Sequence, residues 1–213
     1  GERLLSEEQF YELWQLQTPL KVSANDSYNS NFRGYGLGWF VTDVKGGYKQ
    51  VYHTGGLIGT VTQFTMIPDL DLAIVVLTNQ MNGMAFNTIT NTIKDSYLGY
   101  EDRHWLEKYG ARNRDYLKYN DSIKAEVYDN VEKAKKQVSL PSPEQIVGTY
   151  TDDWFGDITI THDGKSYKIK CERSPRLFGE LLPYNATTFV AKWNDRSYDA
   201  DVFMQFTFNE KEE

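Results

Sequence analysis

Six consecutive apolar residues, Leu72–Leu77, form the strongest structural signal in this chain. The run is short for a helix but has the length of an ordinary buried strand. It follows the turn Asp69-Leu70-Asp71, and before that turn Thr60–Ile67 alternates between apolar and polar side chains. Both segments are therefore predicted to be strands of one sheet. Because Leu72–Leu77 is apolar on both faces, we expect it to be central and covered on each side.

Helices are predicted on either side of this strand region. Ser6-Glu7-Glu8-Gln9 matches a capping box that begins a helix, and Pro19 is expected to end it. Two further strands are predicted at residues 38–44 and 50–54. After the last strand, apolar residues recur every three to four positions, which indicates a helix that packs on the sheet. The residues expected to face the sheet are Phe86, Ile89, Ile93 and Tyr97.

Two segments with different sequence patterns follow this helix. Residues 101–139 mix charges with scattered aromatic residues and predict a helical linker, which Leu140-Pro141-Ser142-Pro143 ends. Residues 140–213 then read as short strands, with Asp163-Gly164 between two of them as a hairpin turn. We therefore expect an α+β fold: a first domain over residues 1–100, the linker, and a small all-β barrel or curved sheet.

Composition excludes several kinds of partner and site. The net charge is −7, and an acidic chain without a basic run is a poor match for nucleic acid. No apolar stretch approaches the ~20 residues that span a bilayer. The only cysteine, Cys171, excludes an internal disulfide, and the histidines lie scattered, so we expect no metal and no cofactor. Gly1 begins the chain without a signal peptide, which is expected either of a cytoplasmic protein or of a piece cut from a longer one, and we favour the piece.

Three motifs carry a family resemblance: Tyr35-Gly-Leu-Gly-Trp39, Val51-Tyr-His-Thr-Gly-Gly56 and Gln63-Phe-Thr-Met-Ile-Pro68. With Leu72–Leu77 they closely resemble the C-terminal half of the catalytic domain of serine β-lactamases and penicillin-binding proteins. The nearest branch looks like the class C-type enzymes and their esterase-like relatives. The resemblance implies part of that family's antiparallel sheet with flanking helices, and a periplasmic or other extracytoplasmic bacterial location.

The resemblance also assigns roles to a triplet on the strand that borders the family's active site. By this likeness His53 takes the basic position, Thr54 the hydroxyl position and Gly55 the third, and these three bind substrate. Gly56 corresponds to the residue whose N–H helps to form the oxyanion hole, and glycines here would let substrate approach the backbone. Histidine stands where Lys is common, and it is mostly neutral at pH 7. The resemblance therefore does not imply recognition of a substrate carboxylate, and β-lactams, peptidoglycan peptides and esters all remain open.

The family's Ser-x-x-Lys and Tyr-x-Asn motifs are missing from the sequence. The nearest matches, Thr18-Pro-Leu-Lys21 and Tyr28-Asn-Ser-Asn31, have the wrong residue or the wrong spacing. The chain therefore holds no nucleophile, and we expect it to be inactive alone and to need the N-terminal part of the catalytic domain. An incomplete sheet would also leave an exposed edge, through which copies of the chain could form a homo-oligomer.

The C-terminal part has its own resemblance. Residues 147–157, 173–175 and 189–193 look like a domain of unknown function that is often appended to these hydrolases and is thought to form a lipocalin-like sheet. Two other interpretations stay open. The chain could be a non-catalytic ligand-binding module with a vestigial hydrolase half, or a purely structural protein in which His-Thr-Gly-Gly is an ordinary strand end.

Overall fold

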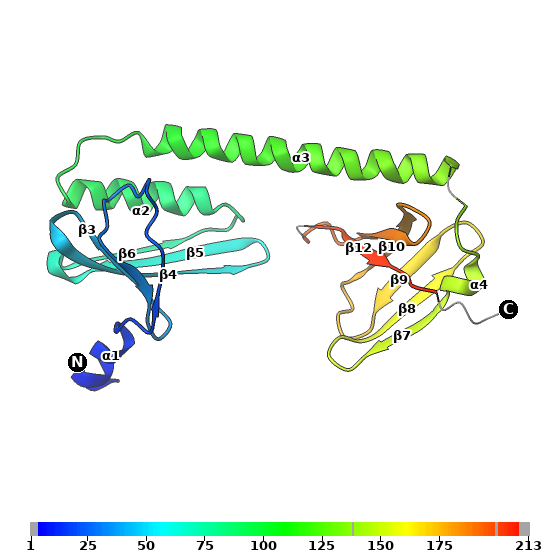
Figure 1. The fold of residues 1–213 in the computed structure, drawn as a ribbon, viewed down its shortest axis with the longest axis horizontal. Helices are drawn as coiled ribbons and strands as arrows, with labels where there is room; N and C mark the ends of the chain where they lie inside the picture. Colours follow the sequence, from blue (N-terminus) through cyan, green and yellow to red (C-terminus); the bar gives the residue numbers. More distant parts are fainter. Residues whose placement is uncertain (1–3, 138, 199, 209–213) are drawn as a thin grey trace. The chain divides into compact units, whose positions relative to one another are not determined.

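A computed structural model describes residues 4–137, 139–198 and 200–208 of the chain. The chain divides into two compact units, one within residues 1–115 and one within residues 116–213. Figure 1 shows both, and each is described by itself below. The division falls inside the helix α3 (Trp105–Gln137), which lies in the segment predicted as a linker.

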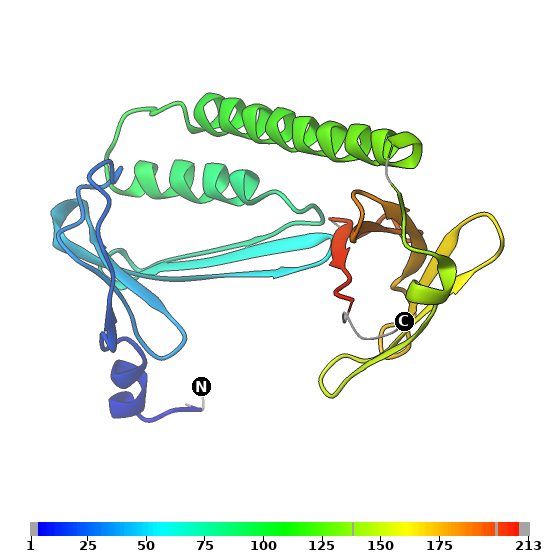
Figure 2. The same ribbon diagram turned by 45° about the vertical axis from the view of Figure 1, so that its right-hand side comes forward.

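The first unit is built on a six-stranded antiparallel sheet in which sequence order and spatial order are the same. Its strands are β1 (Thr18–Pro19), β2 (Arg33–Tyr35), β3 (Phe40–Val44), β4 (Tyr48–Leu57), β5 (Thr60–Ile67) and β6 (Leu72–Leu77). The 3-10 turns η1 (Lys45–Gly47) and η2 (Pro68–Leu70) join β3 to β4 and β5 to β6. Helix α2 (Gly83–Tyr97) runs along one face of the sheet (Figures 1 and 2).

Local sequence signals are confirmed in this unit. The Ser6 side chain accepts a hydrogen bond from the Gln9 N–H, and the Gln9 side chain accepts one from the Ser6 N–H, so the predicted capping box begins α1 (Glu7–Leu13). The bounds of β5 and β6 are those predicted. Pro19 does not end the helix; it lies in β1, because α1 has already ended at Trp14.

The predicted position of β6 is wrong. Within the described residues β6 pairs only with β5, so it is an edge strand and not a central one. Its alternate residues Leu72, Ile74 and Val76 are buried in the core beneath α2. On the other face Val75 is 60% exposed and Leu77 74% exposed, because the described part of this unit supplies no layer over them.

The predicted buried face of α2 is largely wrong as well. Phe86 packs in the core as expected, but Ile89, Ile93 and Tyr97 are exposed. The helix is rotated so that Thr90 and Lys94 are buried instead, and the Lys94 ammonium donates to the Gln50 side chain of β4 at 2.8 Å. The buried face of this helix therefore includes a polar contact, which apolar periodicity does not reveal.

The second unit holds another six-stranded antiparallel sheet, again in sequence order. Its strands are β7 (Gly148–Asp152), β8 (Gly156–His162), β9 (Tyr167–Cys171), β10 (Phe178–Pro183), β11 (Thr188–Trp193) and β12 (Val202–Gln205), and α4 (Pro143–Ile146) precedes them. The sheet curls around its core (Figure 2), and the described residues pair β7 only with β8 and β12 only with β11. The predicted alternatives of barrel or curved sheet thus resolve to a curled open sheet, and the α+β class is confirmed.

The hairpin predicted at Asp163-Gly164 is confirmed. β8 pairs with β9 out to His162 and Tyr167, and the Asp163 carboxylate accepts hydrogen bonds from the N–H groups of Lys165 and Ser166. Gly164 has φ +88°, a conformation that glycine adopts without steric cost. Cys171 packs at the margin of the core of this unit, where burial raises the pKa of its thiol.

Candidate functional site

The residues of the predicted site lie on the last half of β4, where one neighbouring strand stops. The pairing of β3 with β4 ends at Phe40 and Tyr52, whereas β5 stays paired with β4 as far as Leu57 and Thr60. From His53 onward β4 therefore has a strand partner on one side only. Thr54, Gly55 and Gly56 are also exposed to solvent.

The backbone N–H of Gly56 is directed toward the unpaired side of β4. Gly56 lies opposite Val61 of β5, and the carbonyl and N–H of Val61 both bond to Thr78, on the β6 side. In an antiparallel ladder, when one residue of a facing pair directs its N–H and C=O away from the neighbouring strand, the residue opposite does the same. Gly56 therefore directs its N–H and C=O away from β5. The register is continuous, so Thr54 opposite Gln63 has the same orientation. β4 therefore offers two N–H groups, two residues apart, at the margin that β3 leaves open.

The side chain of His53 is held by two aromatic residues. The Tyr35 hydroxyl lies 3.0 Å from Nε2 of His53, and the Phe40 ring stacks on the imidazole with centroids 5.7 Å apart and an interplanar angle of 23°. Neither Tyr35 nor Phe40 was predicted to be a site residue. The one sequence feature that pointed to Tyr35 is its place at the start of the motif Tyr35-Gly-Leu-Gly-Trp39. The motif does not reveal that the Tyr35 hydroxyl contacts His53.

The two glycines of the site differ in their surroundings. A Cβ atom added to Gly55 would lie 2.8 Å from the Thr62 hydroxyl oxygen, which is closer than an ordinary contact. A Cβ atom added to Gly56 would meet Val61 Cγ1 at 3.7 Å, which is an ordinary van der Waals contact. Packing against β5 thus restricts position 55 to a small residue, whereas position 56 has room for a methyl group. The predicted roles of these residues toward a substrate stay predictions.

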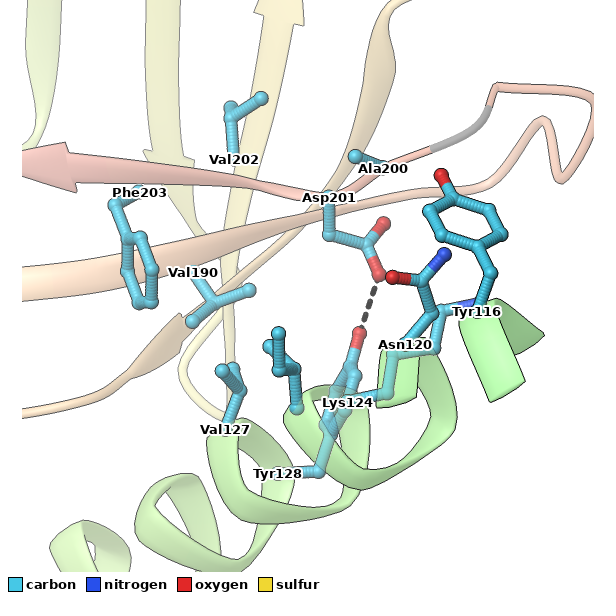
Figure 3. Close-up of a pocket in the computed structure, with 11 residues that line it drawn as sticks. Tyr116, Asn120, Lys124, Val127, Tyr128, Val190, Ala200, Asp201, Val202 and Phe203 are labelled. Carbon is cyan, nitrogen blue, oxygen red and sulfur yellow. Dashed lines mark hydrogen bonds between the residues drawn. The ribbon is translucent and has the colours of Figure 1, made fainter. Parts of the chain in front are cut away.

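A separate cavity lies in the second unit, between α3 and the strands β11 and β12 (Figure 3). It measures about 420 Å³, and apolar residues such as Val127, Val190 and Phe203 form much of its wall. The Tyr128 hydroxyl donates to the Asp201 carboxylate at 2.6 Å, as the dashed line in Figure 3 marks.

The charge of Asp201 is already satisfied within the protein. The Arg196 guanidinium donates to both carboxylate oxygens, at 2.7 and 3.2 Å, and the Trp193 N–H donates at 3.1 Å. Burial acts to raise the pKa of Asp201, but these hydrogen bonds outweigh it and hold the pKa below its usual value. Burial and the Asp201 carboxylate together raise the pKa of Tyr128 to about 12. The cavity therefore presents a structural polar pair beside an apolar wall.

Two wider properties concern metals and membranes. The described residues contain no group of three or more His, Cys, Asp or Glu side chains placed to hold a metal ion. Among those same residues, no helix combines the length and the apolar character that crossing a bilayer requires.

Comparisons with known proteins give two family matches and similarity to solved structures. Residues 3–98 match the family described as Beta-lactamase, and residues 132–213 match the Domain of unknown function (DUF3471). The octameric penicillin-binding protein homologue from Pyrococcus abyssi is similar at 15% sequence identity with a TM-score of 0.41, over 97% of this chain. This chain spans 39% of the length of that protein. A comparison with curated proteins gave no match. Residues 3–98, which make up less than half of the chain, are therefore similar to the family described as Beta-lactamase.

Proposed function

We propose that the first unit is the C-terminal portion of a serine hydrolase domain and supplies one wall of its acyl-transfer site. The observation that carries the proposal is the early end of β3, which leaves β4 unpaired on one side from His53 onward. Fixed N–H donors at such a margin stabilise the oxygen of a carbonyl under attack, because they are already oriented when negative charge develops.

In this proposal each residue of the site has a distinct task. The Gly56 N–H donates to the oxygen of the tetrahedral intermediate, and Thr54 and Gly55 line the path of the substrate. His53, fixed by Tyr35, contacts a polar group of the substrate beside the scissile bond. The serine nucleophile and its lysine come from an N-terminal segment of the same catalytic domain. The substrate is an amide or ester: a β-lactam, a peptidoglycan peptide or a simple ester.

The first experiment compares the chain alone with the chain joined to its N-terminal complement, the segment proposed to supply the serine and the lysine. The chain is incubated with a fluorophosphonate or a reactive β-lactam and its intact mass is measured. We expect no adduct on the chain alone, and a stoichiometric adduct on the complement's serine when the preceding segment encoded by the same gene is joined to it. A stoichiometric adduct on a serine of the chain by itself would refute the proposal.

The second experiment tests the Gly56 N–H in that joined protein. Gly56→Pro removes the N–H, and the β4–β5 ladder does not use this group. We expect the rate of acylation to fall by ~10²-fold, the usual effect of losing one oxyanion donor. Gly56→Ala keeps the N–H and its Cβ makes an ordinary contact, so it serves as the matched control. Equal rates for both variants would remove Gly56 from the site.

The cavity in the second unit favours a second candidate function, a ligand-binding module beside an inactive hydrolase half. Its apolar wall suits the apolar part of a small molecule. Binding of an apolar fluorescent dye to the chain tests it: Val202→Asp, which puts a charge on a lining residue of the cavity, should abolish binding. Val147 is equally exposed, at 43%, and lies outside the cavity lining, so Val147→Asp should bind as the wild type does. An equal loss in both variants would show that the dye binds elsewhere.

Three finer points belong to the same proposal. The second unit is a lipocalin-like accessory domain of the hydrolase, and the protein acts in an extracytoplasmic compartment of a bacterium. In the absence of the N-terminal complement, the edge strand β6 pairs with a second copy of the chain. Light scattering tests the pairing, because a monomer at every concentration would contradict it. Cell fractionation with antibody detection tests the compartment.

A further inference from the structure

A polar cavity of about 530 Å³ lies inside the first unit, on the side of the sheet that α2 covers. Strands β2 to β5, helix α2, the loop before β2 and the beginning of α3 all contribute to its wall. The residues on which the inference depends are Arg33, Gln50, Gln63, Thr90, Lys94 and Arg112. The cavity is distinct from the open margin of β4 at His53 to Gly56.

Lys94 is the central charge of this cavity and is only 4% exposed. Its ammonium donates to Gln50 Oε1 at 2.8 Å and lies 3.7 Å from the centroid of the Tyr28 ring. Burial lowers the pKa of Lys94 to about 7, although the carboxylates of Asp95 and Asp26 act in the opposite direction. A lysine ammonium has three donors, so Lys94 retains capacity toward the cavity.

Two other buried side chains of the wall each have an oxygen atom without a hydrogen-bond partner among the described residues. Gln63 is 7% exposed and Thr90 3% exposed, and neither Gln63 Oε1 nor the Thr90 hydroxyl has a partner. The Gln63 amide nitrogen makes only a long contact of 3.4 Å to Asn87 Oδ1. Buried polar groups are almost always paired, and leaving one unpaired costs about 1–3 kcal/mol. The wall therefore has buried hydrogen-bonding groups that a bound ligand could satisfy.

The charges around the cavity have an excess of cations. Neither Arg33 nor Arg112 has a carboxylate within ion-pair distance in the described parts of the chain, although both line the cavity with Lys94. The carboxylate in the lining is Asp26, and its Oδ2 already accepts from the N–H groups of Tyr28 and Ser30 and from the Ser30 hydroxyl. The two arginines, together with Lys94 in its protonated form, outnumber the one occupied carboxylate and attract a negatively charged ligand.

We propose that this cavity binds a small hydroxylated oxyanion, a carboxylate or phosphate that carries hydroxyl groups. Lys94 and Arg112 hold the charged group, and Gln63 and Thr90 bond to the hydroxyl groups. The site does not depend on the hydrolase activity, because its ligands lie on the α2 side of the sheet and include none of the residues assigned to the reaction. Fork-shaped Arg donors and amide side chains are the ordinary means by which proteins bind such compounds.

The experiment is a calorimetric titration of the chain with three probes: inorganic phosphate, glucuronate and glucose. Phosphate and glucuronate share the oxyanion, and glucuronate and glucose share the hydroxyl groups. We expect both anions to bind and glucose not to bind. Tighter binding of glucuronate than of phosphate would assign the natural ligand to the carboxylates, and the reverse order to the phosphates.

Variants locate the binding. Lys94→Met keeps the length of the side chain and removes its charge, and it should weaken anion binding by at least ~10-fold, the equivalent of one charge-assisted hydrogen bond. Lys108→Met removes a charge from an exposed residue of α3 that lies outside the lining, and should leave binding unchanged. Arg112→Gln, at an exposed position where folding is not at risk, should also weaken binding.

Three results would overturn the inference: no binding of either anion, equal binding by the Lys94→Met and wild-type chains, or binding of glucose as tight as that of the anions. The first result includes the case in which a further polypeptide segment fills the cavity. Because these titrations involve no acylation, their failure leaves the proposed hydrolase function untouched.

Discussion

The hydroxyl oxygen of Tyr35 lies 3.0 Å from Nε2 of His53, so β2 fixes the orientation of a side chain that belongs to β4. A phenol O–H is a good donor and an unprotonated imidazole nitrogen is a good acceptor. Where the Tyr35 hydroxyl donates to Nε2, His53 carries its proton on Nδ1. The nitrogen that remains for a substrate is then a donor.

Substitution of Tyr35 should change the tautomer of His53. In the wild-type chain at pH 8 we expect the ring 15N spectrum to show a protonated Nδ1, and Tyr35→Phe should shift the population toward a protonated Nε2. The lost hydrogen bond should also reduce the free energy of unfolding by about 1 kcal/mol. Tyr52→Phe is the control, because Tyr52 stacks on the same Phe40 ring. A wild-type spectrum with the proton on Nε2 would contradict the assignment.

A larger residue at position 55 should destabilise the chain, because its Cβ atom would lie too close to the Thr62 hydroxyl oxygen of β5. Gly55→Ala places its Cβ 2.8 Å from the Thr62 hydroxyl oxygen, and we expect a loss of about 1 kcal/mol in the free energy of unfolding. Adding Thr62→Ala should restore most of it, because the side chain in the way is removed. Urea unfolding of the single and double variants measures the effect, with Gly56→Ala as a nearly neutral control. Additive losses in the double variant would show that the contact does not matter.

Burial of Lys94 predicts a specific dependence of stability on pH. Its pKa is about 7 in the folded chain and ~10.4 for an unfolded lysine, so the unfolded state binds more protons between these values. The free energy of unfolding should therefore rise with pH from about 7 to 9, with a slope from this group of at most ~1.4 kcal/mol per pH unit. Burial also raises the pKa of Tyr28, which lowers stability only above about pH 10, so the window excludes that effect.

The measurement is urea unfolding at pH 7, 8 and 9 of the wild-type and Lys94→Met chains. The difference between their slopes isolates the lysine, because all other titrating groups are shared. Parallel slopes would mean that Lys94 stays charged in the folded state.

Asp95 should be one of the most sensitive residues of the first unit. It is buried, and its carboxylate accepts from the Tyr28 hydroxyl at 2.8 Å and from the Trp105 indole N–H, while Arg103 lies 3.8 Å away. Asp95→Ala leaves the Tyr28 and Trp105 donors without their acceptor and Arg103 without its ion-pair partner, and should cost about 3–5 kcal/mol. Trp105 fluorescence during urea unfolding reports the change. Asp102→Ala removes an exposed carboxylate and should cost less than about 1 kcal/mol; similar losses in both variants would contradict the prediction.

Gly179 should tolerate no side chain. Its Cβ would lie 2.0 Å from the Lys192 carbonyl oxygen, a backbone atom of the paired strand β11 that cannot move without disturbing the sheet. Gly179→Ala should reduce the stability of the second unit by more than about 2 kcal/mol. The added methyl group of Gly148→Ala, in β7, meets open space, so this variant should change stability by less than about 1 kcal/mol. Thermal unfolding followed by circular dichroism compares the two, and equal midpoints would refute the steric argument.

Much of the local structure could be predicted from the sequence. The capping box at Ser6, the strands Thr60–Ile67 and Leu72–Leu77, and the hairpin at Asp163-Gly164 all follow from patterns within a few residues. These elements form because hydrogen bonds to neighbouring backbone groups and alternation along a strand are local properties. The family resemblance likewise depended on short motifs, and it directed attention to His53 and its three neighbours.

Long-range neighbours decided the rest. Apolar alternation cannot tell an edge strand from a central one, so the exposure of Val75 and Leu77 became evident only from the strand order. Tyr35 and His53 are 18 residues apart, and Lys94 and Gln50 are 44 apart, and no sequence period connects either pair. The sequence by itself determined most of the longer strands and helices and the triplet that resembles a family's site. Only the tertiary structure decided what those residues touch, because register and packing bring together side chains that the chain keeps far apart.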